Sequence, residues 1–138
     1  PPSLQVLLYP VTDYESQTRS KTLFARGFFL TRRDIAWFKE RFLGGSRFDA
    51  TAPEVSPLLV DDLSGLAPAL VVTAGFDPLR DEGRQYADAM RAAGTVVDYR
   101  EYGPVVHGFA NFFTLGGASA TATSEVISAI RAHLTRAR

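Results

Sequence analysis

The sequence predicts an α/β fold with parallel strands and flanking helices. Three runs of strand length, at residues 4–9, 69–74 and 95–102, are rich in apolar residues, and helical patterns follow at 78–93 and 120–135. Nearly continuous apolar runs are typical of parallel strands that helices cover on both faces. With 138 residues, of which 46% are hydrophobic, the chain is long enough for one domain with a sizeable core.

Composition excludes several classes of function. The 15 basic and 15 acidic residues cancel, so no basic field favours nucleic acid or an anionic membrane. The absence of cysteine and the presence of only 2 histidines exclude disulfides, thiolate nucleophiles and histidine-rich metal sites. The apolar runs are far shorter than the roughly 20 residues that span a bilayer. No signal peptide is visible, so we expect a cytoplasmic protein, and the opening Pro1-Pro2-Ser3 predicts that the chain starts inside a longer one.

Between the first predicted strand and the first clear helix lies a segment in which apolar residues show no regular spacing. Residues 4–9 form an apolar run that a proline ends, whereas residues 12–29 are polar and then aromatic, with no predicted element. Thr31 has the position of a helix N-cap, and Asp34 lies three residues later, as in a capping box. Apolar residues at helical spacing then predict a helix over 32–43.

The rest of the chain predicts a strand, a helix, a strand and a last helix. Residues 46–68 are predicted as loop because prolines recur there. The strand at 95–102 becomes less apolar along its length, which places it nearer the edge of the sheet. The helix at 78–93 has one apolar side, formed by Leu79, Tyr86, Ala87 and Met90. In the last helix the apolar residues are Val126, Ile127, Ile130 and Leu134, and His133 is expected to face solvent without a role.

An acid and a histidine follow two of the predicted strands. Because the carboxyl ends of parallel strands share one edge of a sheet, Asp77 and His107 can meet there. A buried carboxylate that holds an imidazole in one tautomer leaves its other nitrogen free to take a proton from a hydroxyl. Each residue also has a structural interpretation: Asp77 before Pro78 fits an N-cap, and His107 before Gly108 fits a loop histidine. Because both lie at matching strand ends, the two residues together are better interpreted as the acid and the histidine of a nucleophilic triad.

No serine of the chain fits the third position. The nucleophile elbow, Gly-x-Ser-x-Gly, lies between a strand and a helix, because its tight turn accepts only small flanking residues. Ser46 lacks the final glycine of this motif and follows a helix, and Ser119 lacks it too and lies after the histidine. No His-Gly-Gly-Gly stretch offers an oxyanion hole. The nucleophile is therefore expected outside this chain.

Six motifs, spread over nearly the whole chain, carry a family resemblance. They are Leu7-Leu8-Tyr9-Pro10-Val11-Thr12-Asp13, Gly27-Phe28-Phe29-Leu30, Ser56-Pro57-Leu58-Leu59, Asp62-Leu63-Ser64-Gly65-Leu66, Asp77-Pro78-Leu79-Arg80-Asp81-Glu82-Gly83 and His107-Gly108-Phe109. In this order they resemble the hormone-sensitive-lipase-like branch of the α/β-hydrolases. The run that begins at Asp77 is specific, whereas His-Gly-Phe alone is a weak motif. The acid before the histidine is also the order of this fold.

The resemblance implies where the chain belongs in a larger fold. Because the family's elbow and oxyanion motifs precede the Leu-Leu-Tyr-Pro strand, residues 1–138 resemble the C-terminal half of one α/β-hydrolase domain. Residues 12–45 would be a segment and helix associated with the lid or cap. The triad acid is carried over to Asp77 and the triad base to His107, whereas Asp81 and Glu82 receive structural roles.

The resemblance also implies a substrate and partners. It predicts a pocket for esters with short to medium acyl chains, with Phe28 and Phe29 in its wall, and no metal or cofactor. The missing N-terminal half is one expected partner. Because family members often dimerise through the last strand and helix, a second copy of the chain is another.

The function expected from these residues is that of a serine carboxylesterase, an esterase or lipase that works through an acyl-enzyme. This chain supplies Asp77 and His107 but not the serine, so the isolated chain is predicted to be inactive. Two alternatives stay open. One is a non-catalytic ligand-binding member of the same fold, and the other is a fragment of a prolyl-oligopeptidase-type peptidase, which also has a His-Gly strand end.

Overall fold

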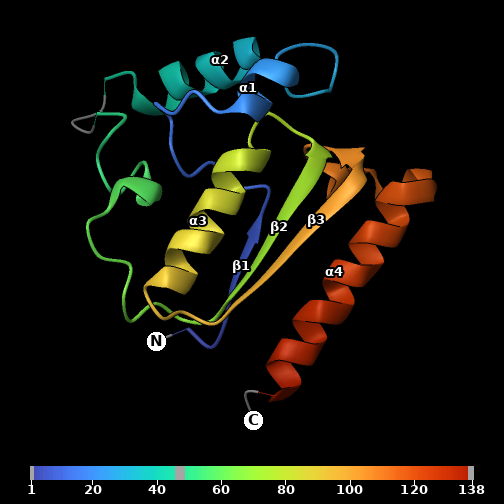
Figure 1. Cartoon of the computed structure of the whole chain (residues 1–138). Coiled ribbons are helices and arrows are strands. Elements are labelled where there is room, and N and C mark those ends of the chain that lie inside the picture. The colour runs from blue at the N-terminus through green and yellow to red at the C-terminus, as the bar shows by residue number, and fades with distance from the viewer. Residues whose placement is uncertain (1, 46–48, 137–138) are drawn as a thin grey trace.

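A parallel three-stranded sheet forms the centre of the molecule, as the computed structural model of residues 2–45 and 49–136 describes it (Figure 1). The strands are β1 (Gln5–Leu8), β2 (Ala69–Phe76) and β3 (Val97–Val106), in the order β1-β2-β3. Seven of the eight β2 residues are buried, since β2 has a strand on either side and helices over both faces. The predicted α/β class and parallel strands are confirmed, and β3 lies at one edge of this sheet.

Two helices cover opposite faces of the sheet. In Figure 1, α3 (Arg80–Ala92) lies in front of the strands and α4 (Gly117–Arg136) lies across the other side. Side chains alternate along β2, so that Ala69 and Val71 join the cluster under α3, whereas Leu70, Val72 and Ala74 join the cluster under α4. This alternation divides the core into two layers.

The predicted apolar side of α3 is correct, and that of α4 is correct for Val126 and Ile130 but not for Ile127 and Leu134. Leu79 and the α3 residues Tyr86, Ala87 and Met90 are all buried. In α4 the buried residues are Ala122, Val126 and Ala129. Ile127 and Leu134 are 45% and 47% exposed, so the buried stripe is narrower and made of smaller side chains than expected.

Two helices in the segment between β1 and residue 45 form a layer over the carboxyl ends of the strands (Figure 1). Helices α1 (Arg19–Leu23) and α2 (Arg32–Leu43) lie at the end toward which the strand arrows point (Figure 1). The predicted α2 begins and ends as expected, with the capping box of Thr31 and Asp34 complete. The sequence pattern missed α1, a single short helix within 12–29. Residues 49–68 form a loop with one 3-10 turn at Pro57–Leu59, and residues 46–48 of the predicted loop lie outside the described residues.

Three further elements differ from the prediction. Strand β3 continues to Val106, four residues beyond the expected end, because an edge strand tolerates Gly103 and Pro104. The stretch after His107, for which the sequence predicted no element, is a 3-10 helix, η2 (Phe109–Leu115). His133 is not simply solvent-facing: its side chain is 21% exposed, and its Nε2 lies 3.1 Å from Oδ2 of Asp98 on β3. Of the helices that the structure describes, none is long and apolar enough to cross a membrane.

Candidate active site

Asp77 lies directly after β2 and is completely buried. Its two carboxylate oxygens have different partners. Oδ1 accepts a hydrogen bond of 2.8 Å from the backbone N–H of Leu79, and the backbone oxygen of Asp77 accepts one of 3.2 Å from Arg80. Helix α3 therefore starts at Arg80, two residues later than predicted, because residues 77–79 form a turn that the Asp77 side chain closes. Asp77 is therefore not the N-cap of α3, which is Leu79, but its Oδ1 closes the turn ahead of the helix and its Oδ2 takes no part in that turn.

Oδ2 of Asp77 lies 2.8 Å from Nδ1 of His107, thirty residues further along the chain. The His107 side chain is 22% exposed, whereas that of Asp77 is 0% exposed. With the carboxylate as acceptor, Nδ1 carries the ring proton and Nε2 is left with a lone pair. The sheet therefore brings the two predicted residues together, with one nitrogen of the imidazole held and the other available to accept a proton.

A close approach of two strands precedes this pair. Ala74 pairs with Tyr102, but the next pair joins Phe76 to Val106, so β3 bulges at this point. A Cβ atom at Gly75 would lie 2.2 Å from the backbone oxygen of Gly103, which only glycine permits. Bulges next to active sites re-aim the residues that follow. Here the bulge lies immediately before Asp77 on one strand and before His107 on the other.

An apolar groove of about 310 Å³ opens beside His107. Its lining combines the segment after β1, helix α2 and the start of α3: Val11, Tyr14, Leu30, Ile35, Phe38, Phe42, Leu79 and His107. Phe38 and Phe42 are 55% and 62% exposed, so the apolar side of α2 faces this groove instead of a core. The sequence showed that α2 is amphipathic, but not which surface its apolar side serves.

Phe28 and Phe29, predicted to form the pocket wall, lie near the strand ends but do not line this groove. The Phe28 ring stacks on Phe76 with 5.5 Å between centroids. The Phe29 ring packs edge-on against Phe112 at 4.9 Å, and its edge would contact a side chain at Gly108. Phe29 is 63% exposed. Their role in substrate binding stays a prediction.

A buried ion pair fixes the segment between β1 and α2. Nζ of Lys21 lies 2.5 Å from Oε2 of Glu82, whose side chain is 0% exposed. Oε1 of Glu82 accepts hydrogen bonds from the backbone N–H groups of Thr12 (2.8 Å) and Asp13 (3.2 Å). Burial raises the pKa of Glu82, and the hydrogen bonds from Lys21 and Thr12 act in the opposite direction. The expected structural role of Glu82 is therefore to hold this segment against the first turn of α3.

Asp81, the residue before Glu82, also attaches the segment between β1 and α2 to the first turn of α3. Its Oδ2 accepts a hydrogen bond of 2.8 Å from the backbone N–H of Ser20, at the start of α1. The Ser20 hydroxyl in turn donates to the backbone oxygen of Pro78 at 2.7 Å. The turn that carries Asp77 is thus bonded to α1 as well as to its own helix.

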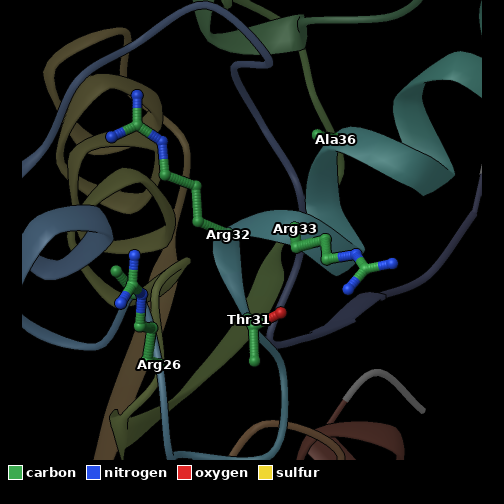
Figure 2. Close-up of a pocket in the computed structure, with 6 residues that line it drawn as sticks. Arg26, Thr31, Arg32, Arg33 and Ala36 are labelled. Atoms are coloured by element: carbon green, nitrogen blue, oxygen red, sulfur yellow. The ribbon is translucent and has the colours of Figure 1, made fainter.

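A second hollow lies at the start of α2, on another part of the surface. Its volume is about 690 Å³, and it is lined by Ala25, Arg26, Thr31, Arg32, Arg33 and Ala36. Figure 2 shows that Arg33 projects to the opposite side of the helix start from Arg26 and Arg32, so the three guanidinium groups do not converge. The amide oxygen of Gln17 accepts a hydrogen bond of 3.2 Å from Arg32. This hollow does not include Asp77 or His107.

The fold and the acid–histidine pair define a class of protein. The family profile of the α/β hydrolase fold matches residues 1–111, and the chain belongs to that family, in the branch that resembles hormone-sensitive lipase. The resemblance in the six sequence motifs is therefore confirmed.

Individual relatives are ester hydrolases by name. The chain is 61% identical over 135 residues to the carboxylic ester hydrolase LipN of Mycobacterium tuberculosis, with 98% of this chain covered. It is 33% identical to an ethyl acetate hydrolase of Pseudomonas putida, over 96% of this chain. Among solved structures, the thermostable carboxylesterase EstE1 from a metagenomic library superposes with a TM-score of 0.86 at 38% identity, over 96% of this chain and 45% of EstE1.

The match covers a minor part of each relative. The chain spans 36% of the length of LipN and 42% of that of the ethyl acetate hydrolase. Both of these relatives are therefore more than twice as long as the chain.

Proposed function

We propose that this chain, completed by the part of the domain that carries the nucleophile and the oxyanion hole, hydrolyses carboxylic esters through a serine acyl-enzyme. Residues 1–138 would be the C-terminal half of that domain, and residues 12–45 its cap-associated segment. The observation that carries the proposal is the 2.8 Å contact between Oδ2 of Asp77 and Nδ1 of His107 beside an apolar groove.

In the proposed mechanism, Nε2 of His107 takes the proton of the serine hydroxyl as the serine oxygen attacks the ester carbonyl carbon. The imidazolium that forms is stabilised by the carboxylate of Asp77, which keeps Nδ1 as the protonated nitrogen. The same nitrogen of His107 then gives its proton to the departing alcohol oxygen, leaving an acyl-serine. Water attacks the acyl group in a second, equivalent round and releases the acid.

The groove supports an ester with an apolar acyl or alcohol part. Its lining is aromatic and aliphatic apart from the Tyr14 hydroxyl and His107, and apolar pockets with few polar groups are the usual form of small-molecule sites. The relatives named as ester hydrolases favour an ester over a peptide or a non-hydrolysed ligand.

The test uses a chimera in which this chain replaces the matching region of LipN, to which it is 61% identical. Hydrolysis of p-nitrophenyl acetate and butyrate is measured for the chimera, for the chain alone, and for two variants of the chimera. His107→Gln is expected to abolish turnover, while His133→Gln, the matched change at the other histidine, keeps it. The chain alone is expected to show no triad-like turnover.

Two results would contradict the proposal. Turnover by the chain alone would place a nucleophile within it. Equal activity of the His107→Gln and unmodified chimeras would remove His107 from the reaction. A fluorophosphonate, which labels activated serines, separates an esterase from a ligand-binding member of the fold, and a peptide substrate assayed beside the esters tests the peptidase alternative.

A further inference from the structure

Tyr9, at the end of β1, has a backbone conformation that tyrosine rarely adopts. Its φ is +40°, in the left-handed region, where a residue with a Cβ atom is strained. The strand pairing continues through this residue, since its N–H donates a hydrogen bond of 2.6 Å to the backbone oxygen of Val72. Such strain persists only where the surrounding structure imposes it, and it is concentrated at functional sites.

The strained backbone changes the face on which the Tyr9 ring lies. Along a strand, successive side chains alternate between faces. Leu7 packs in the layer under α3, and Leu8 packs in the layer under α4. Strict alternation would return Tyr9 to the α3 layer, yet its ring lies with Leu8 in the α4 layer. The positive φ therefore turns the ring toward the side on which His107 and Phe109 lie.

On that side the Tyr9 ring packs against the imidazole. The centroids of the Tyr9 and His107 rings are 4.7 Å apart, with planes inclined by 59°. Phe109 also packs edge-on against the Tyr9 ring, with 5.6 Å between the ring centroids. Burial raises the pKa of the Tyr9 hydroxyl, and the charge of Asp77 raises it further, so the phenol stays neutral beside the pair. The imidazole is thus contacted by a carboxylate at Nδ1 and by a tilted aromatic ring.

We propose, on the basis of the proposed ester hydrolysis, that Tyr9 is a positioning residue for His107. Its ring restricts rotation of the imidazole, which keeps Nδ1 on Asp77 and Nε2 directed at the reacting hydroxyl. The ring, not the hydroxyl, does this, and the strained backbone is what places the ring there.

Three variants of Tyr9 separate the effects of its ring, its hydroxyl and its backbone conformation. Tyr9→Phe keeps the ring and removes the hydroxyl. Tyr9→Gly and Tyr9→Asn both lack the ring, and both residues tolerate positive φ, so the backbone of β1 is preserved in each. In the LipN chimera, Tyr9→Phe is expected to keep kcat within about twofold. The two variants without the ring are expected to lower kcat about 10- to 100-fold, the effect of misplacing a reacting group, with little change in KM for a short ester.

A second measurement does not depend on activity. The chain has 2 histidines, so the imidazole signals of His107 in a ¹⁵N NMR spectrum of the chain are assigned with a His133→Gln variant. In the wild type and in Tyr9→Phe, one protonated Nδ1 is expected for His107. In Tyr9→Gly and Tyr9→Asn, exchange between ring orientations or tautomers should broaden or shift this signal, while the His133 signals stay in place as the reference for folding.

The outcomes distinguish a failure of the Tyr9 proposal from a failure of the proposed ester hydrolysis. An inactive wild-type chimera would overturn the proposed function, and the NMR comparison would still test the positioning of the ring. Wild-type kcat and an unchanged His107 signal in Tyr9→Gly would overturn the positioning role. If Tyr9→Phe lowered kcat as much as Tyr9→Gly does, the effect would belong to the hydroxyl, and this too would contradict the proposal.

Discussion

Lys21 and Glu82 form an ion pair of 2.5 Å that joins the segment ahead of α2 to the first turn of α3. The two side chains are 11% and 0% exposed, so each charge depends on the other for compensation. Because α2 provides one wall of the groove and α3 follows Asp77, the ion pair fixes the groove relative to the acid–histidine pair. Its effect on stability can be measured in the chain alone.

Removing one member of this ion pair should strongly lower the stability of the folded chain. Glu82→Ala leaves the Lys21 charge buried and frees the N–H groups of Thr12 and Asp13, so the free energy of unfolding should fall by about 3–5 kcal/mol. Urea denaturation of the chain measures this. The matched control is Lys39→Ala, since Lys39 pairs with Glu15 at the surface, and a change below about 1 kcal/mol is expected there. Equal losses in the two variants would contradict the buried role.

Asp77→Asn should damage catalysis more than structure. The amide keeps the size of the side chain but cannot hold the imidazole in the required tautomer, so kcat of the LipN chimera should fall by about 10⁴-fold. Asp88→Asn is the control, because Asp88 lies on the exposed side of α3 in an ion pair with Arg91, and we expect wild-type kcat. A fall of less than tenfold in Asp77→Asn would argue against the proposed role.

Phe42→Ala should alter substrate preference rather than the reaction itself. Phe42 lines the groove, where its ring stacks on Tyr14 at 6.3 Å. Loss of this wall should lower kcat/KM of the chimera for a butyrate ester by about tenfold, and for an acetate ester by less. Trp37→Ala removes an exposed aromatic of the same helix that does not line the groove, and the ratio of the two esters should not change. Identical effects in both variants would mean that the groove does not bind the substrate.

Two glycines face each other at the bulge, and only one of them should resist substitution. At Gly75 a Cβ atom would overlap the backbone of Gly103, whereas at Gly103 a Cβ atom would meet nothing within 4 Å. Gly75→Ala should therefore lower the free energy of unfolding by about 1–3 kcal/mol, the usual cost of overpacking, and should weaken the contact between Asp77 and His107. Gly103→Ala should be close to neutral. Thermal unfolding and the His107 NMR signal test both expectations.

Asp98 predicts how stability changes in acid. Hydrogen bonds from Arg100, and then from His133, lower the pKa of Asp98 from 3.8. A carboxylate with a lowered pKa stabilises the folded state fully above its unfolded-state value, and this contribution is lost as the pH falls through the folded-state pKa. The stability difference between the wild type and Asp98→Asn should therefore be largest above pH 3.8 and shrink below it. A difference that grows on acidification would contradict this assignment.

The sequence predicted those elements whose signals are local. The α2 capping box, the buried strand β2 and the acid at its end are all readable from neighbouring residues, and the structure agrees with them. The meeting of Asp77 with His107 followed from one topological rule, that parallel strands end at a common edge.

Features that depend on contacts between residues far apart in the sequence could not be predicted from it. The buried side of α4 consists largely of alanines, because small side chains let the helix approach the sheet, whereas a sequence pattern gives more weight to Ile127 and Leu134. Lys21 looks like a surface residue until the fold places Glu82 beside it. The extension of β3 through Gly103 and Pro104 contradicts local propensity and depends on the neighbouring strand.

The left-handed turn at Tyr9 has a consequence for how this protein tolerates insertions and deletions. Adding or removing one residue within β1 would exchange the faces of Leu7 and Leu8 and carry the ring of Tyr9 away from His107. The loop at 49–68 has no strand alternation that an added or removed residue would reverse. The length of this four-residue strand therefore constrains both the packing of the sheet and the position of the Tyr9 ring, although no side chain within Gln5–Leu8 belongs to the proposed triad.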